Sequence, residues 1–202
     1  MLSHPGRSIV LTQIVFIFIL PILLLYFGVI SQEAKFFLLA ASSLIIYSIV
    51  RVEKWTHHDL GLRTDNIKSG WPYYAASSLL LIVALLMFDH YFVTSNTLTL
   101  RTIIQRLVFF IPMSVFQEFA FSVFLLQRLA ILLNKKSLVI LASALVFSFM
   151  HIIYDVPPLV IVFSFFGSML SSMVYLYKPN FLLVCIAHSA VNITAVMLGF
   201  FI

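Results

Sequence analysis

The chain has 202 residues, of which 62% are hydrophobic and only 9% are charged. A soluble domain is typically about half apolar and about a quarter charged, so the composition excludes an ordinary soluble fold and indicates a membrane protein. The net charge of +5 indicates basic loops on one side of a bilayer rather than nucleic-acid binding, because the sequence has no basic stripe or aromatic platform.

Apolar runs long enough to cross a bilayer as helices follow one another along the chain. At about 20 residues per span, they predict helices over 9–30, 34–50, 72–93, 103–133, 137–155, 158–177 and 181–201. The first run is longer than the apolar region of a signal peptide and lacks a small-residue cleavage site, so we interpret it as an uncleaved span. The expected fold is all-α: one integral membrane domain over 1–202, a bundle of about seven transmembrane helices.

The polar connections predict how this bundle lies in the membrane. The longest, residues 51–70, is expected to form a loop or a short amphipathic helix in the interface, and residues 51–71 leave room for an eighth, partial span. A cytoplasmic N-terminus assigns to the inner side Arg7, Arg51, Lys54, Arg63, Lys68, Arg128, Lys135, Lys136 and Lys178. The outer side then receives only Lys35, Arg101 and Arg106. The positive-inside rule therefore predicts a cytoplasmic N-terminus, and the compact chain favours a bacterial inner membrane.

Four polar side chains interrupt three of the apolar runs. Glu118 lies within 107–133, where an acidic group costs roughly 2.5–3.5 kcal/mol and needs a partner inside the protein. His151 lies in the next span, and His188 and Asn192 share one face of the last span as residues i and i+4. At about 1.5 Å of rise per residue, the four side chains reach overlapping depths, which predicts a polar cavity inside the membrane.

The sixth span carries a stripe of small residues. Ser164, Ser168 and Ser172 recur every four residues, a spacing that lets two membrane helices approach closely. We interpret this stripe as helix packing.

The polar set is suited to hydrolysis. A buried carboxylate beside a histidine can take a proton from water, and a second histidine with an asparagine amide can donate to the oxyanion that forms. We expect no resident metal or other cofactor. The alternative is zinc held by Glu118, His151 and His188, since two histidines and a glutamate form a known zinc triad and the spacing does not separate the two mechanisms.

Two short motifs on these spans point to a family. Phe147 to His151 matches Phe-x-x-x-His, and His188 to Asn192 matches His-x-x-x-Asn. In this order on hydrophobic helices, they resemble the CPBP (CAAX protease and bacteriocin-processing, or Abi) family of intramembrane proteases over roughly residues 55–195. The family's first motif, Glu-Glu-x-x-x-Arg, appears here as Gln117-Glu118-x-x-x-Ser122.

The resemblance implies an intramembrane endopeptidase with defined roles for five residues. Glu118 would act as general base with His151 as its partner, and His188 and Asn192 would donate to the oxyanion. Gln117 cannot accept a proton and would orient water or substrate. The implied partners are membrane lipid and a protein or peptide with a membrane-embedded or C-terminal anchor segment.

Two other functions remain open. The Gln117 and Ser122 replacements favour a catalytically silent member of the family that serves as a membrane binding or immunity protein. A small transporter is the third hypothesis, because a buried Glu and His can relay protons.

Overall fold

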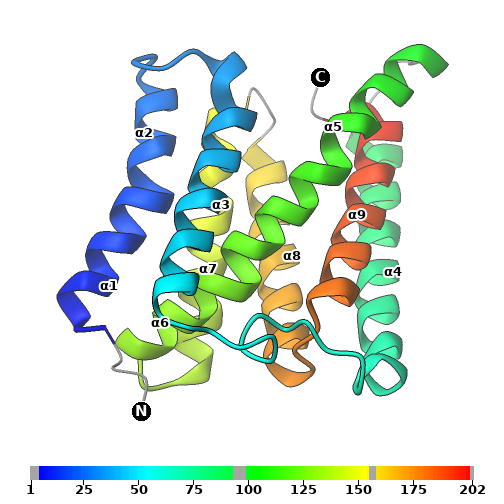
Figure 1. The fold of residues 1–202 in the computed structure, drawn as a ribbon. Helices are drawn as coiled ribbons and strands as arrows, with labels where there is room; N and C mark the ends of the chain where they lie inside the picture. The colour runs from blue at the N-terminus through cyan, green and yellow to red at the C-terminus, as the bar shows by residue number, and fades with distance from the viewer. Residues whose placement is uncertain (1–4, 93–98, 155–157, 201–202) are drawn as a thin grey trace.

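The chain folds as a bundle of membrane-spanning helices (Figure 1), and the computed structural model describes residues 5–92, 99–154 and 158–200. Within these residues six helices are long and apolar enough to cross a membrane, and a seventh apolar helix, Phe181–Met197, is shorter. The six longer helices are Arg7–Tyr26, Gln32–Val52, Ile67–Tyr91, Leu100–Leu132, Lys136–Ile153, Pro158–Tyr177. The predicted all-α membrane bundle is therefore confirmed.

Several of these helices contain more than one segment. The first three spans comprise α1 (Arg7–Ile14), the π-helix η1 (Val15–Ile19) and α2 (Leu20–Tyr26), then the 3₁₀-helix η2 (Gln32–Ala34) and α3 (Lys35–Val52), then α4 (Ile67–Phe92). The remaining spans comprise α5 (Leu100–Glu118), the π-helix η3 (Phe119–Leu125) and α6 (Leu126–Leu132), then α7 (Lys136–Met150) and the 3₁₀-helix η4 (His151–Ile153), then α8 (Pro158–Tyr177) and α9 (Phe181–Met197).

Three predicted boundaries are wrong for local reasons. The first span ends at Tyr26 instead of residue 30, because Gly28 adopts a positive φ of 69° and its turn closes the helix. The third span, α4, begins at Ile67 instead of residue 72, so Pro72 lies inside it rather than at its start. The last span ends at Met197 instead of residue 201, and Gly199 beyond it adopts a positive φ of 82°. The predicted ends at 93 and 155 lie outside the described residues. In the described segment 53–66 the chain forms turns, with neither an interfacial helix nor a further span.

The helix made of α5, η3 and α6 occupies the centre of the bundle. It runs obliquely past α9, α7 and α1 (Figure 1), and its π-helical part is buried from Ala120 to Leu125. Phe18 of η1 packs edge-on against Phe121, with ring centroids 5.1 Å apart. Since π-helical turns are frequent at functional sites, the position of η3 directly after Glu118 is consistent with a site there.

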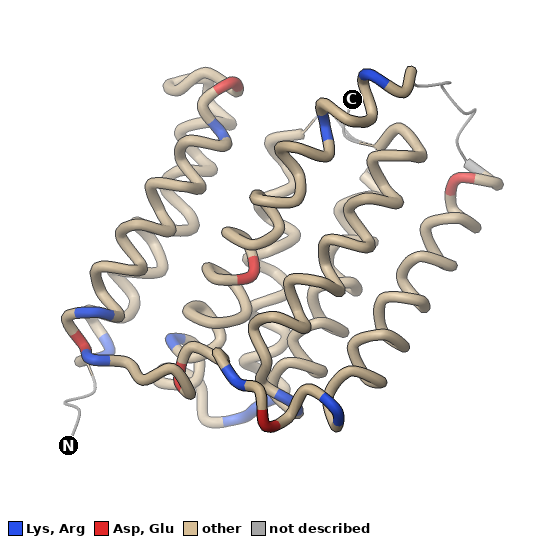
Figure 2. The backbone as a smooth tube through the Cα atoms, turned by 45° about the vertical axis from the view of Figure 1, so that its right-hand side comes forward, with Lys and Arg blue, Asp and Glu red and all other residues tan. Residues whose placement is uncertain are grey.

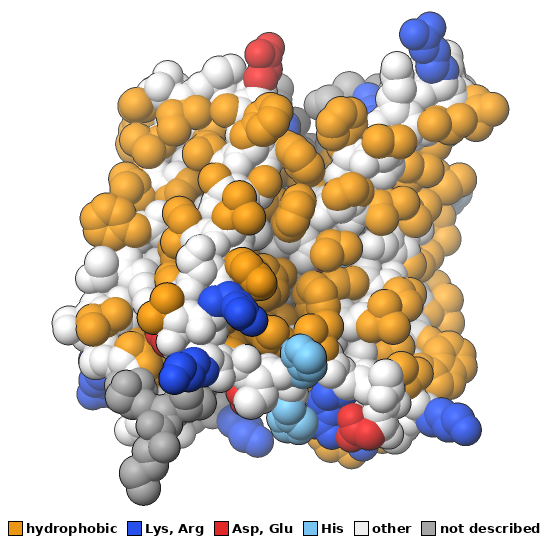
Figure 3. All heavy atoms as spheres, in the orientation of Figure 1, with side chains coloured by type: hydrophobic (Ala, Val, Ile, Leu, Met, Phe, Trp, Pro, Cys, Tyr) orange, Lys and Arg blue, Asp and Glu red, His pale blue; other side chains and the backbone are white. Residues whose placement is uncertain are grey.

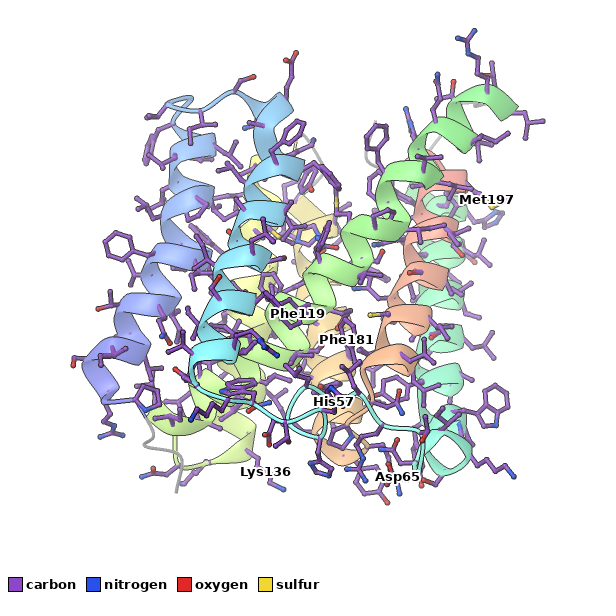
Figure 4. All side chains as sticks on the ribbon, viewed as in Figure 1. His57, Asp65, Phe119, Lys136, Phe181 and Met197 are labelled. Carbon is purple, nitrogen blue, oxygen red and sulfur yellow. The ribbon has the colours of Figure 1, made fainter. Side chains whose placement is uncertain are left out.

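Charged residues gather at the two ends of the bundle. Figure 2 shows most Lys and Arg positions at the end where α1 begins, and Figure 4 places His57, Asp65 and Lys136 there, away from Met197. Figure 3 shows hydrophobic side chains over the middle of one face, with charged side chains toward its ends. This distribution is typical of an integral membrane protein.

The segment 53–66 closes one end of the bundle. Arg128 of α6 is only 1% exposed and pairs with Glu53 at 2.7 Å, while its guanidinium lies 4.6 Å from the centre of the Phe124 ring. A buried arginine without a carboxylate would be costly, so this pair holds the segment against the central helix.

Asn180 joins the same segment to α9. It is 0% exposed, and its Nδ2 donates to Asn66 Oδ1 at 2.7 Å and to Arg63 O at 2.9 Å. Its Oδ1 accepts from Leu183 N at 3.0 Å and so caps the first turn of α9.

We predict that Asn180→Ala lowers the free energy of unfolding by about 2 kcal/mol, because α9 loses its cap and buried groups of the segment lose their partners. Denaturant unfolding of the detergent-solubilised protein measures this. Asn134→Ala is the control, since Asn134 is exposed and its removal should cost less than about 0.5 kcal/mol. Equal effects of the two substitutions would contradict the structure.

Candidate active site

A cavity of about 100 Å³ lies inside the bundle, between α4, α5, η3, η4, α7, α8 and α9. Four of the side chains predicted to act together line it: Glu118, His151, His188 and Asn192. A water molecule needs about 10–15 Å³ measured in this way, so the cavity has room for several. Its walls are largely apolar, and polar groups inside it therefore interact strongly.

Glu118, which is 4% exposed, receives two hydrogen bonds. Nδ1–H of His188 donates to Oε1 at 2.5 Å, and the hydroxyl of Ser122, one turn further along the same helix, donates to Oε2. Ser122 replaces the arginine of the family motif and supplies a hydrogen bond without a charge. Among the described residues, His188 is the ionisable side chain within ion-pair distance of Glu118.

The contact with Glu118 determines how His188 presents its second nitrogen. When Glu118 is ionised its carboxylate can only accept, and Nδ1 of His188 then carries the proton that lies between them. The remaining nitrogen, Nε2, is then left for groups in the cavity. A carboxylate that fixes the tautomer and orientation of a histidine in this way is a common arrangement in catalytic sites.

Asn192 is held one helical turn away. Its Nδ2 donates to Ser114 Oγ at 2.9 Å, and the Ser114 hydroxyl donates in turn to Phe110 O at 2.8 Å. Ser114 was not among the residues predicted from sequence. The signal that could have found it is the spacing Ser114-x-x-x-Glu118-x-x-x-Ser122, which puts three polar groups on one helix face.

His151 occupies another wall of the cavity. It is buried at the end of α7, and its Nδ1–H donates to Phe147 O at 3.0 Å, so the lone pair of the neutral ring lies on Nε2. The Phe147 ring contacts both histidines, with centroids 5.1 Å from His151 and 5.9 Å from His188. The phenylalanine of the second motif therefore packs against both imidazoles.

Gln117 does not share the cavity of the other four residues. Its amide lies 3.9 Å from Met150 Sδ and lines a second cavity of about 50 Å³ together with Lys35 and Tyr154. Consecutive residues of a helix point in different directions, which explains why Gln117 and Glu118 enter different spaces. Phe121 lines both cavities.

The serine stripe of α8 faces the main cavity. Ser164, Ser168 and Ser172 are buried and line it, opposite the residues from α5 and α9. Gly167 beside them lines the cavity too, and a Cβ there would make an ordinary contact with a Leu81 methyl group 3.7 Å away. The stripe therefore lines the cavity as well as packing, a role that sequence analysis missed.

The donor set does not resemble a formed metal site. Within the described residues, no group of three His, Cys, Asp or Glu side chains is arranged to hold a metal ion. Glu118 and His188 are bonded to each other, and Nδ1 of His151 is bonded to a backbone carbonyl. These hydrogen bonds occupy Nδ1 of both rings, and zinc held by Glu118, His151 and His188 through Nε2 stays a prediction that metal analysis of the purified protein tests. We derive no step through a metal.

Comparison with known proteins agrees with the motifs. Residues 98–194 match the family model described as type II CAAX prenyl endopeptidase Rce1-like. No curated protein and no solved structure matches the chain. The matched residues include Glu118, His151, His188 and Asn192. The predicted resemblance to the CPBP family of CAAX-type intramembrane proteases is thereby confirmed, through its Rce1-like members, for residues 98–194 of this chain.

Proposed function

We propose that this protein is an intramembrane endopeptidase that hydrolyses a peptide bond of a membrane-associated protein or peptide. The observation that carries the proposal is the hydrogen bond between Glu118 and His188, in a cavity that His151 and Asn192 also line. The Rce1-like match supports the reaction class. The largely apolar cavity wall suits a substrate that arrives from the bilayer.

The proposed reaction starts at His151. Its Nε2 accepts a proton from water, and the water oxygen attacks the carbonyl carbon of the scissile bond. His151 suits this role because its Nδ1–H is bonded to a backbone carbonyl, which leaves the lone pair of the neutral ring on Nε2. The proton then passes to the leaving nitrogen as the carbon–nitrogen bond breaks.

The negative charge that develops on the substrate carbonyl oxygen needs donors. We assign this role to Asn192 Nδ2–H and to Nε2–H of a protonated His188, as the family resemblance implies. Both side chains are already held by α5, through Ser114 and Glu118, and they need little reorganisation during the reaction.

Glu118 receives a different role from the one that the resemblance implies. Its two carboxylate oxygens accept from His188 and Ser122, so it is placed to orient the imidazole and to balance its charge. The glutamine that stands in place of the family's first glutamate, Gln117, cannot accept a proton, which leaves His151 as the base. Gln117 itself lines the second cavity, and we assign it no role at the scissile bond.

We predict that His151→Ala and Glu118→Gln each lower the cleavage rate at least about 100-fold. The first substitution removes the general base, and the second weakens the hydrogen bond that holds His188 as an oxyanion donor. The assay uses proteoliposomes and a fluorogenic farnesylated peptide that ends in a CAAX sequence. Ser148→Ala is the control, since Ser148 is a buried serine that lines neither cavity. Gln117→Ala should stay within a few-fold of wild type, whereas a water-orienting role would require a large loss.

Wild-type rates in both His151→Ala and Glu118→Gln would contradict the proposal. A biological phenotype that both variants retain, without any cleavage by the wild-type protein, would favour the silent binding or immunity protein. Proton or solute flux through liposomes would favour the transporter.

We also propose that the end closed by residues 53–66 faces the cytoplasm of a bacterial cell, because Lys and Arg are concentrated there. In a Cys185→Ser background, which removes the one native cysteine, a membrane-impermeant maleimide should label Glu33→Cys on intact cells. It should label Lys136→Cys only after permeabilisation, since this exposed position lies at the opposite end. The reverse pattern would show the opposite orientation.

A further inference from the structure

We infer that Ser114 is a positioning residue that orients the Asn192 amide toward the substrate carbonyl. This inference rests on the proposed function. It concerns a serine outside the three motifs, located one helical turn before Glu118 on α5. Ser114 is 0% exposed, so it has no access to substrate and can act only through another side chain.

The hydrogen bond that Ser114 donates determines how it can interact with Asn192. A hydroxyl has a single proton, and that of Ser114 is donated to Phe110 O at 2.8 Å. Toward Asn192 the oxygen can therefore only accept. The group that faces Ser114 must be the NH₂ of Asn192, at 2.9 Å, and not its carbonyl oxygen.

This constraint determines what Asn192 offers to the cavity. An amide NH₂ carries two protons, and with one of them bound by Ser114 the other is available to an oxyanion. Without the acceptor, the amide can turn its own oxygen toward the cavity, where it would repel a developing negative charge. Ser114 thus excludes the unproductive orientation of the amide.

The geometry of the two helices supports the same assignment. Ser114 and Glu118 are four residues apart on α5, and Asn192 and His188 are four residues apart on α9, which runs antiparallel to α5 (Figure 1). Two side-chain hydrogen bonds between the described parts of these helices, Ser114–Asn192 and Glu118–His188, therefore lie one turn apart. Each holds one of the two proposed oxyanion donors.

The competing explanation is that Ser114 and Asn192 only fasten two membrane helices together. A fastening role predicts a change in stability with unaltered chemistry in the molecules that remain folded. A positioning role predicts a lower kcat with an unchanged KM, because the amide acts on the transition state and not on the bound substrate.

The experiment is a double-mutant cycle with Ser114→Ala and Asn192→Ala, on the full chain in proteoliposomes with the farnesylated CAAX peptide as probe. Asn192→Ala should lower kcat about 100–1,000-fold, the range for loss of one oxyanion donor. Ser114→Ala should lower kcat about 10-fold or more with KM unchanged. The double variant should be no slower than Asn192→Ala, because Ser114 acts through Asn192.

Two further variants separate positioning from damage to the fold. Ser114→Thr keeps the hydroxyl and should recover most of the kcat lost in Ser114→Ala. Ser148→Ala removes another buried serine, whose hydroxyl also donates to a backbone carbonyl of its own helix, Leu145 O. This serine has no hydrogen bond to Asn192 in the structure, so its removal should leave kcat unchanged. Thermal unfolding of every variant shows whether the assayed protein is folded.

Each outcome decides the question. A wild-type kcat in folded Ser114→Ala, or losses that multiply in the double variant, overturns the inference and leaves the proposed function intact. A wild-type protein that does not cleave the probe or any unprenylated anchor peptide overturns both. Three results together support the inference. Ser114→Ala lowers kcat in the wild-type background, it has no further effect when Asn192 is already alanine, and Ser114→Thr restores kcat.

Discussion

A carboxylate buried where water is scarce is the constraint on which this structure depends. Glu118 must find hydrogen-bond donors inside the bundle, and His188 and Ser122 supply them. Its contact with His188 brings α5 and α9 together at one level and sets their register. One turn further along, the same register brings Asn192 to Ser114. The polar groups of the cavity are thus organised by a single hydrogen bond between two antiparallel helices.

The rest of the bundle keeps this contact enclosed. Residues 53–66 close one end, where Arg128 binds Glu53 and Asn180 joins the segment to α9. On another side, Phe147 packs against both histidines and against Phe121, so aromatic rings support both imidazoles. These contacts limit how far the polar groups can move, and limited movement is what electrostatic stabilisation of a transition state requires.

Much of the fold and the core of the site could be predicted from the sequence. The lengths of the apolar runs located seven helices, because the thickness of a bilayer sets how many apolar residues a span needs. The cost of burying a carboxylate in such a run identified Glu118 as the residue around which the polar cavity is built. Boundaries at Gly28 and Pro72 depended on local backbone geometry, which hydrophobicity does not report. Ser114 and the direction of Gln117 were missed, since the contacts of a side chain depend on which helix packs against it.

The pairing of Glu118 with His188 is tested most directly by ¹⁵N NMR of the histidine side chains in labelled protein. We predict that Nδ1 of His188 appears as a protonated, strongly hydrogen-bonded nitrogen. We also predict that Glu118→Gln shifts this signal and that Gln117→Ala leaves it unchanged. An Nδ1 without a proton, or a signal that is the same in wild type and in Glu118→Gln, would contradict the arrangement on which the proposed reaction depends.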